Sequence, residues 1–261
     1  MSSDDSQQVR SLRDGQQVPS LRVGYVDLHC HYIPAIDDGV RTVEQGIALC
    51  EALGALGYTT VAATPHIRPG MFDNQRADLE ARFARFVEAA AGRDLPELVL
   101  GAEHFCDGDF RELFESRQAL PYTGGKALLI ELSTERVPPG VAEQCFRMQV
   151  QGVRPVIAHP ERYSQLFDAT TALERLLDMG VPWLLDLMSL EGKYGRRPRR
   201  AAERMLEEGA YYAACTDCHR PEDAEIVARA IERLRQLVGG DEAHVLIADH
   251  PRAILRGEVD P

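Results

Sequence analysis

The 261-residue sequence has no apolar stretch long enough to span a bilayer and no excess of basic residues. Its formal net charge of -12 argues against nucleic acid or an anionic membrane surface as the main partner. Residues 1–22 are rich in Ser, Asp, Gln and Arg and lack the apolar core of a signal peptide. We therefore expect a flexible tail over residues 1–22, one domain over residues 23–261, a cytoplasmic location and no membrane insertion.

The six cysteines fit neither a disulfide framework nor a zinc finger. Cys215 and Cys218 form a CxxC pair, but no second pair completes a zinc site. A phosphatase with a cysteine nucleophile needs an arginine six residues later. The residues at that offset are Ile36, Leu56, Glu112, Gln151, Pro221 and Ala224. The sequence excludes that mechanism, and we expect reduced, buried or half-buried thiols.

Two other common signatures are missing. Gly124-Gly125-Lys126 lacks the upstream glycine and the following Ser or Thr of a phosphate-binding P-loop. The Gly-x-Ser-x-Gly turn of serine hydrolases does not occur.

Apolar strand-like runs alternate with segments of helical period, a pattern typical of an α/β protein with a parallel sheet. The predicted strands are 24–28, 59–64, 98–102, 127–132, 153–158, 183–188 and 211–216. The predicted helices are 42–56, 76–91, 141–151, 171–179, 199–208 and 221–237, with a closing segment at 249–255. Seven strands favour a closed or nearly closed (β/α) barrel over an open sheet.

Two pairs of metal-capable side chains follow the first and last predicted strands. They are His29 with His31, and Asp217 with His219. Because residues i and i+2 of an extended chain point to the same side, each pair can direct two ligands to one point. Cys30 and Cys218 lie between the paired residues and should point away from that point.

Four further candidates stand at the ends of other predicted strands: His66, Glu103, Glu131 and His159. Any one of them is explained equally well by a cap or a loop contact. Six strand ends with such residues in one chain favour a metal site. His104, His244 and His250 lack paired partners, and we expect them to be structural or surface residues.

The motifs that carry these residues resemble the PHP (polymerase and histidinol phosphatase) superfamily. They are His29-Cys30-His31, Ile36-Asp37-Asp38-Gly39, Ala63-Thr64-Pro65-His66, Gly101-Ala102-Glu103, Ile130-Glu131, Ala158-His159-Pro160-Glu161-Arg162-Tyr163 and Asp217-Cys218-His219. Within the superfamily the chain is most similar to bacterial capsule and exopolysaccharide tyrosine phosphatases, and the similarity covers about residues 24–257. The resemblance implies a PHP phosphatase domain with a distorted seven-stranded (β/α)7 TIM-like barrel.

The resemblance also implies three divalent metal ions. One would be held by His29, His31, Glu103 and Asp217, a second by Asp38, His66 and His219, and a third by Glu131 and His159, with Glu103 bridging. Spacing alone does not distinguish Asp38 from Asp37. Ligands of this kind suit manganese, iron or zinc, and the resemblance favours Mn²⁺.

The chain departs from the family pattern in three places. It carries the 22-residue tail, it has Asp186 where an asparagine is expected, and the loop after His219 reaches Arg220 and Pro221 directly.

Three divalent ions and four carboxylates leave a net charge of +2, which a phosphomonoester dianion neutralises. A metal-activated hydroxide would then attack phosphorus without a covalent enzyme intermediate. Arg162 is close enough to His159 to contact the same phosphate, although a salt bridge to Glu161 or to a loop carboxylate is an alternative. Arg68 and Arg220 are weaker candidates for that role. The basic run 193–200 would either capture an acidic tail or form a solvated helix start.

The leading functional hypothesis is a metal-dependent, non-cysteine protein-tyrosine phosphatase of polysaccharide synthesis or export. Its partner would be a phosphotyrosine protein, in particular a bacterial tyrosine autokinase. A small-molecule phosphatase such as a histidinol phosphatase is the nearest alternative. A non-catalytic partner-binding barrel stabilised by metals is a third hypothesis, disfavoured by the complete ligand set.

Overall fold

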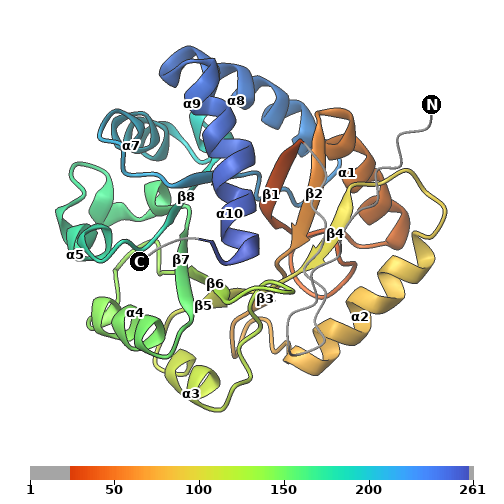
Figure 1. Ribbon diagram of the computed structural model, residues 1–261, viewed down its shortest axis with the longest axis horizontal. Coiled ribbons are helices and arrows are strands. Elements are labelled where there is room, and N and C mark those ends of the chain that lie inside the picture. The colour runs from red at the N-terminus through yellow and green to blue at the C-terminus, as the bar shows by residue number, and fades with distance from the viewer. Residues whose placement is uncertain (1–23, 259–261) are drawn as a thin grey trace, which may run out of the picture.

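The computed structural model describes residues 24–258, so the predicted tail at residues 1–22 lies outside the described residues. Parallel strands occupy the centre and helices surround them (Figure 1). The strands are β1 (Tyr25–Cys30), β2 (Tyr58–Ala63), β3 (His66–Ile67), β4 (Glu97–Leu100), β5 (Glu103–Phe105), β6 (Ala127–Glu131), β7 (Arg154–Ala158), β8 (Trp183–Asp186) and β9 (Ala213–Cys215).

The helices follow the strands in the expected alternation. They are α1 (Val43–Ala55), α2 (Arg76–Ala89), α3 (Phe110–Glu115), α4 (Val141–Val150), α5 (Glu174–Asp178), α6 (Leu187–Leu190), α7 (Arg196–Glu207), α8 (Asp223–Val238), α9 (Gly240–His244) and α10 (His250–Arg256). α1 begins after Thr42, whose hydroxyl accepts a hydrogen bond from the Gln45 N–H. No helix in residues 24–258 is both long enough and apolar enough to cross a membrane.

The α/β prediction with parallel strands is confirmed, but the single seven-stranded barrel is not. The described strands form two sheets, one with the order β1-β2-β4 and one with the order β3-β5-β6-β7-β8-β9. The predicted strand 59–64 ends early because Pro65, the residue after Thr64, has no N–H to donate to a sheet. The chain then joins the second sheet at β3.

The predicted strand 98–102 divides in the same way at Gly101. A side chain at this position would place its Cβ 2.8 Å from the ring of Tyr122, so glycine is required by close packing. Hydrogen bonds keep the two sheets aligned across the break: the Gly101 N–H donates to the Ala63 carbonyl (2.8 Å) and the Glu103 N–H to the Pro65 carbonyl (3.1 Å).

The first and last strands meet at their carboxyl ends. The His31 N–H donates to the Cys218 carbonyl (2.9 Å), and the Asp217 N–H donates to the His29 carbonyl (2.8 Å). The two halves of the predicted ligand set are thereby joined by backbone hydrogen bonds, although nearly two hundred residues separate them.

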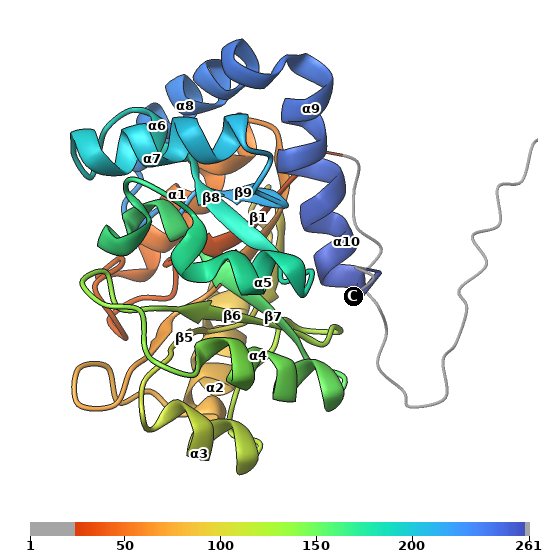
Figure 2. The ribbon, with the colours of Figure 1, turned by 90° about the vertical axis from the view of Figure 1, so that its left-hand side faces the viewer.

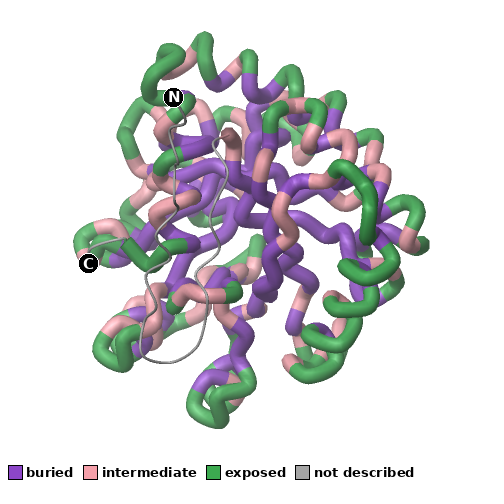
Figure 3. Tube along the Cα trace, turned by 45° about the vertical axis from the view of Figure 1, so that its right-hand side comes forward, coloured by how far each residue is buried: buried purple, intermediate pink, exposed green. Residues whose placement is uncertain are grey.

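Buried residues fill the centre of the molecule, and exposed residues lie on the outer helices (Figure 3). Alternate residues of the strands, including Val26, Leu28 and Leu129, form an inner cluster to which Ile254 and Leu255 of α10 contribute. Figure 2 shows α10 beside β1 and β9. The end of the strands that α10 covers is therefore closed by apolar side chains. Polar side chains gather at the other end, the carboxyl end.

Some element boundaries differ from the prediction. The helix predicted at 171–179 is a 3-10 turn (Thr171–Leu173) followed by the short α5. α7 begins at Arg196 rather than at residue 199, since Pro198 lies in its first turn, where no backbone N–H is needed. The short helices α3 and α6 were not predicted, because neither is long enough to show a period.

Candidate metal centre

The nine predicted ligands lie together in the structure. His29 is the last but one residue of β1, and His31 follows that strand. His66 and Glu103 begin β3 and β5, three residues after β2 and β4 end. Glu131 ends β6, His159 follows β7, and Asp217 and His219 follow β9. Asp38 comes from the loop between β1 and α1. Five of the nine are buried, namely His29, His31, Glu103, His159 and Asp217.

The donor atoms form four overlapping groups, and the atoms within each group lie within 4.8 Å of one another. The groups are His31, Asp38, His66 and His219; His29, Glu103 and His159; His29, His31 and Asp217; and His66, Glu103 and Glu131. The shared residues make one continuous cluster. The grouping of these side chains differs from the expected ligand sets in two respects. His31 also belongs to the group that contains Asp38. Glu131 lies with His66, whereas His159 lies with His29.

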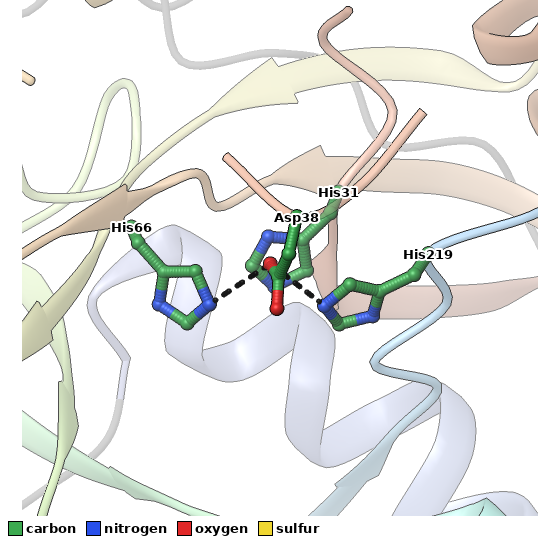
Figure 4. A group of neighbouring side chains, drawn as sticks. All are labelled: His31, Asp38, His66 and His219. Carbon is green, nitrogen blue, oxygen red and sulfur yellow. Dashed lines mark ion pairs between the residues drawn. The ribbon is translucent and has the colours of Figure 1, made fainter. Parts of the chain in front are cut away.

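Figure 4 shows the group in which Asp38 faces two imidazoles. The Asp38 Oδ1 lies 3.4 Å from His66 Nε2 and 3.3 Å from His219 Nε2. Asp37 instead accepts a hydrogen bond from His31 Nδ1 (2.8 Å) and another from the Gly39 N–H (2.9 Å). Asp38 is therefore the one placed to bind a metal, while Asp37 turns the other ring nitrogen of His31 toward the cluster.

Several buried donors of the cluster have no hydrogen-bond partner among the described residues. They include His29 Nε2, His31 Nε2, His66 Nδ1, Glu131 Oε2 and Asp217 Oδ1. His29 Nε2 lies 3.1 Å from Glu103 Oε2 and 3.2 Å from Asp217 Oδ1 without a hydrogen bond to either. Buried polar atoms are rarely left unpaired, so this convergence of imidazole and carboxylate donors fits divalent metal ions.

Charges within the cluster are strongly coupled. Burial alone would raise the pKa of Glu103, but His29 and His66 hold it well below the usual range. Burial and the neighbouring Glu103 raise the pKa of Glu131 to about 7. Burial and the nearby Arg162 lower the pKa of His159 to about 4, which favours the neutral imidazole.

Two ligand positions have a backbone conformation that the sequence pattern did not indicate. Asp217 and His159 adopt positive φ values of +49° and +32°. We had expected Asp217 and His219 to share a side through extended geometry. That explanation was wrong, because β9 ends at Cys215 and a left-handed turn at Asp217 brings the pair together. Such backbone strain is typical of functional sites.

Arg162 lies at the edge of the cluster, where it pairs with Asp217 and, at 3.3 Å, with Asp186. Its Nε is buried and has no hydrogen-bond partner among the described residues. The expected alternative was a salt bridge to Glu161 or to a loop carboxylate. The salt bridge to Glu161 is not formed, because Glu161 is buried and accepts hydrogen bonds from Ser189, Tyr211 and the Asp186 N–H. The salt bridge to a loop carboxylate is formed with Asp217.

The two weaker arginine candidates are placed differently. The Arg68 guanidinium lies 3.8 Å from the centroid of the Phe105 ring. The backbone N–H of Arg220 donates to Asp223. A cavity of about 560 Å³ opens beyond Phe105, between the loops that follow β5 and β6. That volume is within the usual range for ligand pockets.

All six cysteines lie in the described part of the chain and are buried and free. Burial raises the pKa of Cys30 and of Cys218 well above the usual value. Cys30 Sγ donates to the Cys218 carbonyl (3.5 Å), and both side chains pack in the core. These thiols are protonated and point away from the cluster, as expected.

Sequence reasoning missed two residues that support the site. Asp27 accepts hydrogen bonds from Thr216 and from the His29 N–H. Tyr194 stacks on Arg162, with the guanidinium carbon 4.3 Å from the ring centroid. A lone carboxylate inside an apolar run could have indicated a structural role for Asp27. Nothing in the sequence around Tyr194 indicated that it would contact Arg162.

The fold and the site define an α/β protein with a candidate metal centre between its parallel strands and the loops that follow them. The chain belongs to the capsular polysaccharide synthesis CpsB/CapC family, whose model matches residues 25–256. The family resemblance stated from the sequence is confirmed.

The relatives are named phosphatases. The chain is 26% identical over 234 residues to the tyrosine-protein phosphatase YwqE of Bacillus subtilis, covering 89% of this chain and 92% of that protein. It is 25% identical over 242 residues to the tyrosine-protein phosphatase CpsB of Streptococcus pneumoniae, covering 90% and 99%. A solved structure from work on YwqE and CpsB, described as unique metal-dependent tyrosine phosphatases, matches with a TM-score of 0.81 and 26% identity over 88% of this chain and 94% of that one.

Proposed function

We propose that this protein is a metal-dependent phosphatase that removes phosphate from phosphotyrosine in proteins. The observation that carries the proposal is the convergence of nine imidazole and carboxylate side chains. Six of them, His29, His31, His66, Glu131, His159 and Asp217, present buried atoms that have no hydrogen-bond partner among the described residues. Membership of the CpsB/CapC family and the similarity to YwqE and CpsB support the same activity.

The nine ligands we assign are His29, His31, Asp38, His66, Glu103, Glu131, His159, Asp217 and His219. Their geometry supports several divalent ions rather than one, because Glu103 lies between His29, His66 and His159. We propose three ions, with Mn²⁺ as the first candidate and iron or zinc as alternatives. When bound, such ions supply positive charge for the phosphoryl oxygens and make a nearby water acidic enough to act as a nucleophile.

The protein residues supply orientation and charge. The hydrogen bond from His31 Nδ1 to Asp37 fixes the ring so that Nε2 faces the cluster. The hydrogen bond between His219 Nδ1 and the Asp217 carbonyl (2.8 Å) does the same for His219. Both residues therefore offer Nε2 to the cluster.

Arg162 is the residue we assign to the phosphate itself. Its guanidinium lies beside Asp217, and its Nε is not used by any described residue. A planar guanidinium can donate two parallel hydrogen bonds to a phosphoryl group. The leaving group of phosphotyrosine is a phenolate whose conjugate acid has a pKa of about 10. It therefore depends less on a proton donor when it leaves than an alkoxide does.

We also propose the domain organisation, barrel, substrate and location that the sequence implied. One domain over residues 23–261 would carry the activity, and the two sheets would together make the distorted (β/α)7 barrel, supported by the hydrogen bonds that join them. The substrate would be a tyrosine autokinase of polysaccharide synthesis, and the location would be cytoplasmic.

Substrate comparison tests the proposal. The metal-loaded protein should hydrolyse a phosphotyrosine peptide with a higher kcat/KM than histidinol phosphate or the same peptide carrying phosphoserine. Faster turnover of histidinol phosphate would favour a small-molecule phosphatase. No turnover of any of the three with manganese, iron or zinc, together with a metal-dependent rise in Tm, would identify a non-catalytic metal-stabilised barrel.

A further inference from the structure

We propose that the loop of residues 191–195 is a two-sided clamp that positions Arg162 on one side and the His219 segment on the other. This inference rests on the proposed function. Its two contact residues are Lys193 and Tyr194, which are neighbours in the basic run noticed in the sequence.

Tyr194 restrains the guanidinium of Arg162. The Tyr194 ring covers one face of the guanidinium at 4.3 Å, while Asp186 and Asp217 pair with its edge. The ring and the two carboxylates therefore surround the arginine. An arginine stacked on an aromatic ring keeps its orientation at a lower entropic cost than a free side chain does.

Lys193 contacts a different carboxylate, although its Nζ also lies 5.9 Å from the centroid of the Tyr194 ring. Its Nζ donates to Asp223 Oδ1 (2.8 Å), and Asp223 Oδ2 accepts hydrogen bonds from the His219 N–H (2.9 Å) and the Arg220 N–H (3.2 Å). Asp223 is therefore a carboxylate that holds the backbone of a predicted metal ligand, and Lys193 supplies its counter-charge.

The backbone of the loop fixes both contacts. Gly192 and Gly195 flank the pair with φ values of +75° and +102°. Added Cβ atoms would meet nothing closer than 3.9 Å at Gly192 and nothing within 4 Å at Gly195, so glycine is required for conformation rather than for space. The loop is anchored by the hydrogen bond from the Lys193 N–H to the Met188 carbonyl (3.2 Å).

Two arginines of the basic run, Arg197 and Arg199, make contacts outside the clamp. The Arg197 guanidinium lies over the Phe167 ring (4.6 Å) and pairs with Asp168 (3.5 Å). Arg199 pairs with Glu203 on its own helix (3.2 Å). The run therefore divides in two: Lys193 and Tyr194 support the site, and the helical arginines make separate surface contacts.

A double-mutant cycle tests the Tyr194 half of the clamp. Tyr194→Leu should lower kcat/KM for a phosphotyrosine peptide by about tenfold, as expected for the loss of a partly desolvated cation–π contact. Tyr194→Phe keeps the ring and should retain most activity. Phe167→Leu removes the other arginine–aromatic stack near α7 and serves as the matched control, with wild-type kinetics expected.

The decisive comparison uses the Arg162→Ala background. If Tyr194 acts through Arg162, adding Tyr194→Leu to Arg162→Ala should cause no further loss of kcat/KM at unchanged metal content. A full tenfold further loss in that background would overturn the inference. The wild-type protein separates the two proposals: if it has no phosphotyrosine activity the proposed function fails, whereas additive losses in an active protein contradict only the clamp.

Metal binding tests the Lys193 half. The chain has two lysines, so Lys193→Met can be compared directly with Lys126→Met on the exposed segment before β6. Lys193→Met should weaken Mn²⁺ binding, measured by calorimetry, by several-fold because Asp223 loses its counter-charge, whereas Lys126→Met should bind as the wild type does. Equal affinities for the two variants would contradict the clamp.

Discussion

Asp27 and Thr216 connect the first and last strands, although 189 positions separate them in the sequence. Asp27 accepts hydrogen bonds from the Thr216 N–H (2.9 Å) and hydroxyl (2.6 Å). Burial raises the pKa of Asp27 to about 6, while the hydrogen bonds from Thr216 oppose that rise. This connection lies next to both proposed ligand pairs. His29, of the pair His29 and His31, is two residues from Asp27, and Asp217, of the pair Asp217 and His219, directly follows Thr216.

Replacing Asp27 should therefore destabilise the protein and its metal centre together. Asp27→Ala leaves the Thr216 donors unpaired in the core, which costs ~1–3 kcal/mol for a buried polar group. Thr216→Val removes only the hydroxyl and should cost less. Urea unfolding and Mn²⁺ calorimetry measure the two effects, and an Asp27→Ala protein as stable as the wild type would show that the connection is unimportant.

Cys218 should be dispensable for catalysis. Its thiol is buried and its pKa is raised well above the usual value, so no thiolate nucleophile is present. Cys218→Ser should keep most of the kcat per folded molecule. Loss of activity at normal metal content would contradict a mechanism without a cysteine nucleophile.

Arg162→Ala should lose about a hundredfold in kcat, the usual cost of removing one electrostatic contact to a transition state. Arg162→Lys should recover little, because an ammonium group cannot make the planar two-point contact. Metal content should stay near the wild-type value, whereas Tm should fall in part because Asp186 and Asp217 lose a buried partner. If stability falls while activity per folded molecule is preserved, Arg162 is a structural residue instead.

His104 should make stability fall in acid. Its Nδ1 hydrogen-bonds to the Leu129 carbonyl (2.9 Å) and its Nε2 accepts from the Leu120 N–H (3.0 Å), which requires the neutral ring. Burial lowers the pKa of His104 to about 4. The unfolded chain therefore takes up a proton that the native state does not, and stability decreases as the pH falls from about 6.5 to about 4.

The His104 effect can be isolated with a variant. Unfolding free energies of the wild type and His104→Gln, both in chelator, should differ at pH 7 and converge toward pH 4. A constant difference across that range would mean that His104 does not titrate on unfolding.

The sequence was sufficient to predict which side chains lie near one another. Glu131 and His159 stand at the carboxyl ends of predicted parallel strands, which share one edge of a sheet, so their proximity to the other candidates could be expected without a structure. The choice between Asp37 and Asp38 could not be made, since adjacent residues in a loop have no periodicity. The loop conformation that turns Asp37 toward His31 decides it.

Other features depend on tertiary contacts that no local pattern records. The division into two sheets follows from Pro65 and from the packing of Tyr122 against Gly101. The left-handed backbone at Asp217 is unusual for a residue other than glycine and is held by the hydrogen bond to the His29 carbonyl. Asp186 was noted as an unexpected carboxylate, and only the structure shows that it faces Arg162.

Metal titration of the chelated protein tests the central claim most directly. Phosphotyrosine hydrolysis and Tm should both fall when metals are removed, because Asp38, Glu103, Glu131 and Asp217 then lose their positive partners. Both should return together as Mn²⁺ is added, and activity should saturate at a stoichiometry of more than one ion per chain. Full activity in a protein shown to contain no metal would contradict the assignment of this cluster as the catalytic centre.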